Sequence, residues 1–482
     1  MKKPLNVYWV RRDLRLHDNP ALSAIAQESK NFAVIFIFEP YMYLAKPQFN
    51  FGYPQRQFLI RAIPRFAKKF QYFHLIFDYP VKTFSRLSEK YDLTVYVNED
   101  IHPDFYKQLN KLKRAGIKIK LFEDQLTVPK SLLTKDSQIY TVFTPFKKAA
   151  WRYLIEAKTA SVASFSTMPI PELVSQSIPA VENEIANRVS NRRVFLFEGT
   201  ELDLDEILGF APNFDDWYFS EEEAIQIAVS FIEKKLANYH TNRNMLALDA
   251  TSKLSLALAW GLISARTLKN LILDKLGLRY VEPDDKNNLG PVTFLSELIW
   301  REFYKYLLYH FPWLLNLEFQ EKKRSILWVK GDVARRRFIA WIKAETGYDL
   351  VDAAMMQIAK TGYMHNRARM LVASILTKNL GVDWRAGQEY FRASLIDLDE
   401  ASNNGGWQWS ASVGADPKPI RIFNPYLQAD KFDPTGLYRK KWLSETAHSW
   451  RNNESHVRDI EPIISHLDAR QEALKRYGLF DD

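Results

Sequence analysis

The segment from residue 395 to residue 409 has the residue types of a ligand site. Two alternating acids are followed by two amides, two glycines and two indoles, which are Asp397, Asp399, Asn403, Asn404, Gly405, Gly406, Trp407 and Trp409. Glycine permits close approach of the backbone to a ligand. A metal site is a weaker interpretation, because Asp-x-Asp without further ligands is a poor signal.

A second segment, residues 294–303, predicts a polar pocket lined by aromatic rings. The side chains that would share one helical face here are Glu297, Trp300, Arg301 and Tyr304. A carboxylate, an indole and a guanidinium on one stripe suit such a pocket. The commoner alternative is a buried tryptophan beside a surface ion pair.

Residues 361–370 combine an amide and a thioether one helical turn apart. Asn366 and Met370 align at i and i+4, as do His365 and Arg369. An amide beside a thioether suits a site that hydrogen-bonds the edge of a base and packs against its face. Packing of Met370 in the core is the alternative.

Two shorter segments are weaker signals. The hydroxyls of Thr251, Ser252 and Ser255 precede an apolar helix, and such residues commonly cap a helix. The same groups could instead hold a phosphate. Trp384 lies at a polar junction, and by itself it is more simply an ordinary packed tryptophan.

The first third of the chain alternates short apolar runs with helix-length polar segments, such as 55–70 and 81–91. The apolar runs are 6–10, 32–39, 74–78, 94–98 and 118–122. This alternation indicates a parallel sheet covered on both faces. We expect an α/β domain over 1–130, a connector over 131–209, and an all-helical domain over 210–482, where apolar residues recur with helical period.

Composition excludes several classes of protein. The chain has 482 residues, a net charge of +9 and no cysteine, which rules out disulfides, thiolate zinc sites and iron–sulfur clusters. It has no Gly-x-Gly-x-x-Gly after the first strand, no Walker loop and no His-Glu-x-x-His, so we expect no metal. The basic excess fits a polyanionic partner. No apolar run approaches the roughly 20 residues of a membrane helix, and we expect a cytoplasmic protein.

Taken together, these segments resemble the photolyase/cryptochrome family, with the class I cyclobutane pyrimidine dimer photolyases as the nearest group. The matching stretches are 9–21, 142–146, 297–303, 346–355, 361–370, 397–423 and 430–443. The resemblance implies an α/β N-terminal domain with a five-stranded parallel, doubly wound sheet, followed by an all-helical C-terminal domain that holds FAD.

The resemblance also implies which residues contact FAD. They are Tyr239, Thr251, Ser252, Lys253, Leu254, Ser255, Phe294, Arg369, Asp397, Leu398, Asp399 and Asn403. In this set Arg369 pairs with Asp397, and the Asn403 amide faces flavin N5, where it can donate or accept a hydrogen bond. Phe294 stands where many relatives have tryptophan.

The resemblance also implies which residues carry electrons and which contact the substrate. Trp407, Trp384 and Trp328 resemble the chain that carries electrons from the surface to the flavin, Trp328 being the outermost. The implied contacts with UV-damaged DNA, its lesion flipped from the duplex, are Arg243, Glu297, Trp300, Arg301, Tyr304, Asn366, Arg367, Met370, Trp409, Arg421 and Gln428.

The implied reaction is light-driven repair, in which excited reduced flavin gives an electron to the dimer, the cyclobutane ring opens and the electron returns. Glu297 would hydrogen-bond the dimer. The resemblance leaves open a second antenna chromophore of folate or deazaflavin type, although the region 95–106, which includes residues 98–100, lacks the Arg-Asp pair common near a folate. We expect a monomer.

Three alternatives remain at this point. The first is a blue-light receptor of cryptochrome type. The second is repair of the (6-4) photoproduct, which needs a histidine where this pocket has Asn366 and Met370, although His365 is adjacent. The third is a DNA-binding module without redox chemistry.

Overall fold

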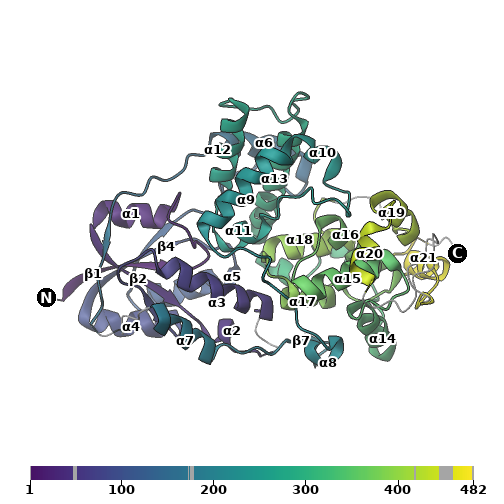
Figure 1. Ribbon diagram of the computed structural model, residues 1–482, viewed down its shortest axis with the longest axis horizontal. Coiled ribbons are helices and arrows are strands. Elements are labelled where there is room, and N and C mark those ends of the chain that lie inside the picture. The colour runs from purple at the N-terminus through teal and green to yellow at the C-terminus, as the bar shows by residue number, and fades with distance from the viewer. Residues whose placement is uncertain are drawn as a thin grey trace.

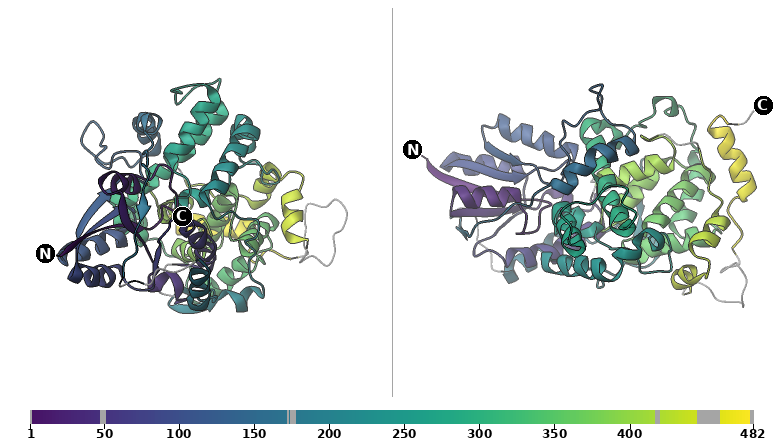
Figure 2. Two further views of the ribbon diagram at one scale, coloured as in Figure 1. Left: turned by 60° about the vertical axis from the view of Figure 1, so that its left-hand side comes forward. Right: turned by 90° about the horizontal axis from the view of Figure 1, so that it is seen from above.

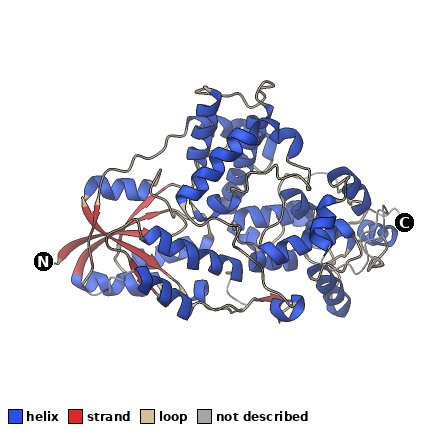
Figure 3. Cartoon of the chain, in the orientation of Figure 1, coloured by secondary structure: helices blue, strands red, loops and turns tan. Residues whose placement is uncertain are grey.

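The computed structural model describes residues 2–46, 51–171, 173, 178–416, 420–444 and 460–479. A sheet-containing half at the N-terminus and a helical half lie side by side along the long axis (Figure 1, Figure 2). Figure 3 shows most of the strands gathered at the N-terminal end. Among the described residues, no helix is both long enough and apolar enough to cross a membrane.

The predicted five-stranded parallel sheet is confirmed, with strand order β3-β2-β1-β4-β5. The strands are β1 (Lys3–Val10), β2 (Asn31–Ile37), β3 (His74–Ile76), β4 (Tyr91–Asn98) and β5 (Lys118–Phe122), and the short β6 (Ser166–Thr167) pairs with β2. On β1, Val7 and Trp9 lie in one apolar cluster, while Tyr8 and Val10 lie in another. Successive side chains therefore point to opposite, equally buried faces, which explains the unbroken apolar run.

Helices cover both faces of the sheet, as predicted. They are α1 (Pro20–Glu28), α2 (Pro40–Tyr43), α3 (Tyr53–Ala67), α4 (Pro80–Lys90) and α5 (Pro103–Arg114). Each has a proline in its first two positions, where the missing N–H is not needed and the fixed φ suits a helix. The predicted helical segments 55–70 and 81–91 correspond to α3 and α4, with ends shifted by up to three residues.

The expected connector contains regular structure that the sequence did not reveal. Its elements are α6 (Phe143–Glu156), α7 (Ile178–Arg188), the antiparallel pair β7 (Val194–Phe197) and β8 (Thr200–Asp203), and α8 (Leu204–Leu208). Helix α6 packs beside α12 and α13 in the helical half (Figure 1). It therefore takes part in the same layer of helices as the predicted site.

The helical half begins with α9 (Glu221–Lys234), η1 (Leu236–Asn238), α10 (Tyr239–Asn242), α11 (Ser255–Trp260), α12 (Ala265–Leu276), α13 (Leu289–His310), η2 (Pro312–Leu315) and η3 (Glu321–Lys323). It continues with α14 (Gly331–Ile342), α15 (Asp349–Thr361), α16 (Asn366–Ser374), η4 (Ile375–Asn379), α17 (Trp384–Ser394), α18 (Glu400–Ser410), α19 (Pro425–Phe432), α20 (Leu437–Leu443) and α21 (His466–Arg476). The predicted helical C-terminal domain is confirmed.

The two halves are joined by a buried apolar and ionic contact. Trp260 of α11 stacks on Phe58 of α3, with ring centroids 4.8 Å apart. Arg266 of α12 lies 2.8 Å from Asp18 and 2.6 Å from Asp124, all of them largely buried. Removing one member of such a buried pair costs about 3–5 kcal/mol, so the halves are held in one fixed arrangement.

The helical half is itself built around two apolar clusters. Tyr239, Leu254 and Phe294 belong to the cluster that continues into the sheet half. Leu398 and Trp407 belong to a second cluster, formed mainly by the helices from α14 onward together with β7, β8 and α8. We call the boundary between these two clusters the seam. Of the predicted cofactor residues, Tyr239, Leu254 and Phe294 border it on one side and Leu398 borders it on the other.

Candidate functional site

The seam brings together two buried carboxylates, each with its own cation. Asp397 lies just before α18, and its oxygens are 2.9 and 2.8 Å from Nη2 of Arg369 on α16. Arg369 is held in place because its Nε also donates to the Met364 carbonyl at 2.7 Å. The Asp397 side chain is fully buried, and the two contacts with Arg369 offset part of the cost of removing its charge from water.

The second carboxylate, Asp399, begins α18. It accepts a hydrogen bond from the Ser402 backbone N–H at 2.9 Å, as an N-cap residue does. Its Oδ2 is also 2.6 Å from Nζ of Lys305 on α13. Burial by itself would raise the pKa of Asp399, but the positive charges of Lys305 and Arg301 outweigh it and hold the pKa far below its usual value.

Asn403 lies one turn into α18 and has an unused acceptor. Its Nδ2 donates to the Gln388 carbonyl at 3.2 Å, whereas its buried Oδ1 finds no hydrogen-bond partner among the described residues. A buried acceptor of this kind is costly unless a ligand supplies a donor. Flavins carry N–H groups, so the residues present fit the expected FAD.

The loop before α11 is anchored by a residue that the sequence analysis missed. Tyr218 is buried, donates its hydroxyl proton to the Lys253 carbonyl at 2.8 Å and accepts from the Ala257 N–H. Lys253 has φ +55, an uncommon conformation for a residue with a side chain. Within the described chain no side chain caps α11, although Ser252 Oγ accepts from the Leu254 N–H at 3.3 Å. The simple capping role of these hydroxyls is therefore not observed.

Tyr363 is another residue that the sequence analysis did not single out. Its ring lies 5.3 Å from the Arg369 guanidinium. Burial raises the pKa of the Tyr363 phenol, and the nearby charges of Arg369 and Asp397 modify it. Tyr363 is part of the segment 361–370, but no periodicity in the sequence distinguishes it from an ordinary core aromatic.

Glu297 and Trp300 lie on the exposed side of the seam, on α13. Glu297 Oε1 is 2.5 Å from Nη1 of Arg243, and both side chains are partly exposed. Trp300 stacks face to face on Phe143 of α6, with centroids 3.5 Å apart and planes 7° apart. Phe143 was not predicted to belong to the site, because it lies in the expected connector.

The N-terminus of α16 brings three predicted side chains to the same region. Asn366 is exposed, and its Nδ2 lies 3.9 Å from Sδ of Met370. Arg367 donates to Asn244 Oδ1 at 2.7 Å. His365 Nδ1 accepts the Arg367 N–H at 3.1 Å, and burial together with the neighbouring arginines lowers the pKa of His365 to about 4. His365 is thus a neutral N-cap of α16.

Four further predicted DNA contacts differ in their surroundings. Arg301 donates to the Gln125 carbonyl at 2.8 Å and is 14% exposed, so its guanidinium is engaged at the contact between the halves. Its contact with DNA stays a prediction. Arg421 is exposed, while Gln428 on α19 and Trp409 on α18 are partly exposed.

The three tryptophans predicted to carry electrons differ in their exposure. Trp407 lies one turn after Asn403 on α18 and is 2% exposed. Trp384, at the start of α17, is fully buried and donates its Nε1–H to Glu318 Oε1 at 3.1 Å. Trp328 is partly exposed and contacts the ring of Tyr477. Trp384 and Trp407 are therefore both buried, and Trp328 is the one of the three that reaches solvent.

The contact between α17 and α18 depends on a glycine. A Cβ at Gly387 would lie 2.1 Å from Cη2 of Trp407, and the ring of Trp407 also packs on Phe391 with centroids 5.0 Å apart. The absence of a side chain at Gly387 thus lets the Trp407 ring lie directly against α17. Trp341 is a further ring neighbour of Trp407, at 6.1 Å.

We expect Gly387→Ala to destabilise the protein by about 1–3 kcal/mol, because the added methyl overpacks a buried indole. The measurement is the free energy of unfolding of the FAD-bound protein in urea. Gly406→Ala on α18 is the matched control, since nothing lies within 4 Å of its Cβ position. Equal stability of the two variants would show that the Trp407 ring can move away from α17 without a loss of stability.

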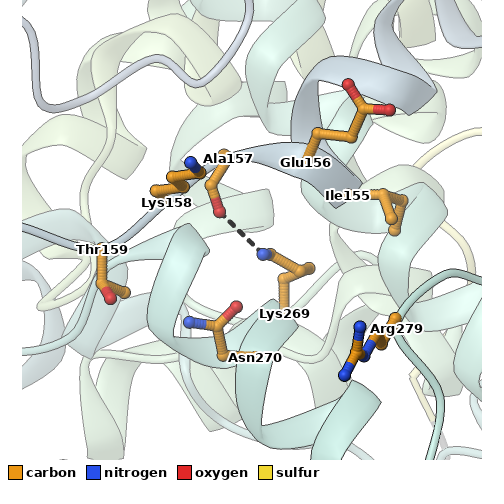
Figure 4. Close-up of a pocket in the computed structure, with 8 residues that line it drawn as sticks. All are labelled: Ile155, Glu156, Ala157, Lys158, Thr159, Lys269, Asn270 and Arg279. Carbon is orange, nitrogen blue, oxygen red and sulfur yellow. Dashed lines mark hydrogen bonds between the residues drawn. The ribbon is translucent and has the colours of Figure 1, made fainter.

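A separate hollow of about 600 Å³ lies at the end of α6, away from the predicted residues. Its lining residues are Ile155, Glu156, Ala157, Lys158, Thr159, Lys269, Asn270 and Arg279 (Figure 4). Lys269 donates to the Ala157 carbonyl at 2.7 Å across it. None of these residues was predicted to belong to the site. In the described part of the chain, no group of three His, Cys, Asp or Glu residues is arranged to hold a metal.

Comparison with protein families gives two matches. Residues 6–163 match the family model described as DNA photolyase. Residues 294–478 match the model described as the FAD binding domain of DNA photolyase. The second match contains α13, α16, α17 and α18, which carry most of the seam.

Known proteins are similar over nearly the whole chain. A deoxyribodipyrimidine photo-lyase from Synechococcus sp. is 34% identical, covering 92% of this chain and 88% of that protein. The deoxyribodipyrimidine photo-lyase of Escherichia coli is 31% identical, covering 98% of both.

Solved structures agree with these relatives. A bacterial class III photolyase from Agrobacterium tumefaciens has a TM-score of 0.78 and 30% identity, covering 99% of this chain and 98% of that one. An archaeal photolyase from Sulfolobus tokodaii, described with two FAD molecules, has a TM-score of 0.78 and 25% identity, covering 98% and 100%. The similarity therefore includes both halves and the seam.

Proposed function

Because the chain belongs to the DNA photolyase family, we propose that it repairs cyclobutane pyrimidine dimers in DNA with light absorbed by its FAD. One observation carries the proposal. A Cβ at Gly405 of α18 would lie 2.1 Å from the ring of Tyr304 on α13. The helix that bears Glu297 and Trp300 is therefore packed directly against the helix that bears Asn403, so substrate and cofactor groups would be neighbours.

On the substrate side, α13 supplies complementary groups for a flipped pyrimidine pair. Trp300 rests on Phe143 with one face and could stack on a base with the other. The Glu297 carboxylate, held by Arg243, can accept a hydrogen bond from a base N–H. Extrusion of a dimer from the duplex costs less than extrusion of paired bases, which favours the lesion.

On the cofactor side, the chain binds and orients the group and keeps water away. Bound FAD supplies light absorption and, when reduced, the electron that opens the cyclobutane ring. Asp397 and Asp399 would accept hydrogen bonds from it, and the amide of Asn403, whose Oδ1 has no partner among the described residues, would hold it as well. Because Asp397 and Asn403 are nearly inaccessible to solvent and the Asp399 side chain is only 15% exposed, their interactions with the cofactor would be stronger than in water.

The remaining assignments follow the same proposal. Trp407, Trp384 and Trp328 conduct electrons to oxidised FAD. Arg243, Arg367, Arg421 and Gln428 contact the DNA backbone and position it without reading sequence. Asn366, Met370 and Trp409 complete the pocket for the lesion. We propose that the protein acts as a monomer in the cytoplasm.

A second chromophore of folate or deazaflavin type is proposed for the sheet half. Ligands of open parallel sheets bind at the carboxyl ends of the strands, where the strand order reverses. At that place Arg11, after β1, lies 3.7 Å from Glu39 and 3.8 Å from Asp100. These charged groups support a polar ligand there, and its identity is read from the absorption spectrum of the purified protein.

The test is a light-dependent assay on an oligonucleotide with one thymine dimer. The purified, FAD-loaded chain is reduced and illuminated, and restored thymines are measured, with a dark sample as control. We expect restoration only in the light. Failure to bind FAD, or no restoration in the light, would overturn the proposal. Restoration of a (6-4) oligonucleotide instead would identify the alternative repair activity.

A further inference from the structure

Lys305 is a buried cation that connects the cofactor site with the sheet half. It lies on α13, and its side chain is 7% exposed. Its Nζ is 2.6 Å from Asp399 Oδ2 and 3.0 Å from Oε1 of Gln125, in the loop that follows β5. A buried ammonium is unfavourable unless it is paired, so these two contacts determine where Lys305 can be.

The charges around the site are balanced in pairs. Arg369 on α16 forms an ion pair with Asp397, and Lys305 on α13 forms an ion pair with Asp399. The other charged groups that act on the second pair are Arg301, on α13, and Asp100, after β4. Without Lys305, Arg301 would be the main cation acting on Asp399, and its Nη1 is already bound to the Gln125 carbonyl.

We propose that Lys305 is a positioning residue for FAD, which keeps Asp399 ionised and fixes its orientation toward the cofactor. An ionised carboxylate can only accept hydrogen bonds, whereas a protonated one also donates. FAD presents hydroxyl and ring N–H donors, so ionised Asp399 matches it and protonated Asp399 does not. The inference rests on the proposed binding of FAD in this seam.

The contact with Gln125 gives Lys305 its second role. The Gln125 carbonyl accepts from Arg301 at 2.8 Å, and its side-chain oxygen accepts from Lys305. The loop after β5 therefore holds one face of α13 at two points. Through Lys305, the position of Asp399 depends on the sheet half as well as on α18. A small displacement of the sheet half would therefore also move the cation that pairs with Asp399.

The test measures FAD binding by fluorescence titration between about pH 5 and about pH 9, on either side of neutral pH. We expect the wild type to bind FAD with little pH dependence, because the depressed pKa of Asp399 keeps it ionised throughout. In Lys305→Met the pKa of Asp399 should rise, because the nearest positive charge is gone while burial remains. Binding should then be about tenfold weaker near neutral pH and weaken further as the pH falls.

Two variants separate this role from a general loss of packing. Lys305→Arg should restore the flat pH profile, because it returns the cation. Lys269→Met is the matched control, since Lys269 is similarly buried but contacts the Ala157 carbonyl outside the seam. It should bind FAD as the wild type does.

A double-mutant cycle separates loss of the Lys305–Asp399 interaction from a general loss of folding in Lys305→Met. With Asp399→Asn as the background, Lys305→Met should cause little further loss of FAD affinity, because the carboxylate it serves is gone. Wild-type affinity and a flat profile in Lys305→Met, or equal losses in both backgrounds, would overturn the inference. If FAD binds as described but no dimer is restored, the proposed repair fails while the role of Lys305 stands.

Discussion

Replacing Trp407 with phenylalanine should nearly abolish the light-driven reduction of oxidised FAD, while repair by chemically reduced protein continues. Trp407 lies one turn from Asn403 and packs against α17, which begins at Trp384. In the proposed path it is therefore the last ring before the flavin, and every electron that comes in from the surface passes through it. Phenylalanine keeps an aromatic ring there, but it is far harder to oxidise than indole.

The substitution is structurally mild. The indole N–H of Trp407 has no hydrogen-bond partner in the described part of the chain, so the change removes volume and no polar contact. The measurement is the rate of flavin bleaching under blue light with an external reductant. Trp9→Phe, in the core of the sheet half, is the matched control. Unchanged bleaching in Trp407→Phe, or lost repair after dithionite reduction, would contradict the assignment.

A comparison of two further variants tests the direction of the path. Trp384→Phe should slow photoreduction if electrons enter through α17. Trp341 also contacts Trp407, with centroids 6.1 Å apart, and it is fully buried. Trp341→Phe should have the smaller effect. The reverse order of rates would place the entry route on the α14 side.

Replacing Glu297 with alanine should lower the yield of repaired dimers and leave FAD bound. A hydrogen bond from a charged group contributes roughly 1.5–3 kcal/mol. The expected loss is therefore on the order of ten- to a hundredfold in affinity or yield. Glu297 and Arg243 are 30% and 20% exposed, so their ion pair adds little to stability and the fold should be unaffected.

The measurement is the binding constant for a dimer-containing oligonucleotide, together with repair per absorbed photon. Glu297→Gln is the informative control, because the amide keeps an acceptor and loses the charge. It should fall between the wild type and Glu297→Ala. Repair by Glu297→Ala equal to the wild type would remove Glu297 from the lesion site.

The sequence alone predicted the elements whose signal is local. Five apolar runs became the five strands, because a parallel sheet buried on both faces demands unbroken apolar residues. The helical period around Trp300 became α13, the long helix that carries residues proposed to contact both substrate and cofactor. Asp397, Asp399 and Asn403 were recognisable because they are neighbours in the chain.

The sequence was uninformative about contacts between residues that are far apart in the chain. Helix α6 was missed within the expected connector, so Phe143 was not connected with Trp300, from which it is separated by 157 residues in the chain numbering. Arg301 was grouped with the DNA contacts through the resemblance, and the shared helix face with Glu297 gave no sign of its contact with Gln125. A helix face alone does not say which neighbour covers it.

What the sequence determined by itself is the five parallel strands, the helical character of the C-terminal half and the chemical types available at each motif, because these follow from short-range periodicity and residue identity. Only the tertiary structure decided which charges meet. Lys305 and Asp399 become partners because α13 and α18 pack together at the seam. No pattern along the chain encodes that pairing, which depends on the close packing of helices far apart in sequence.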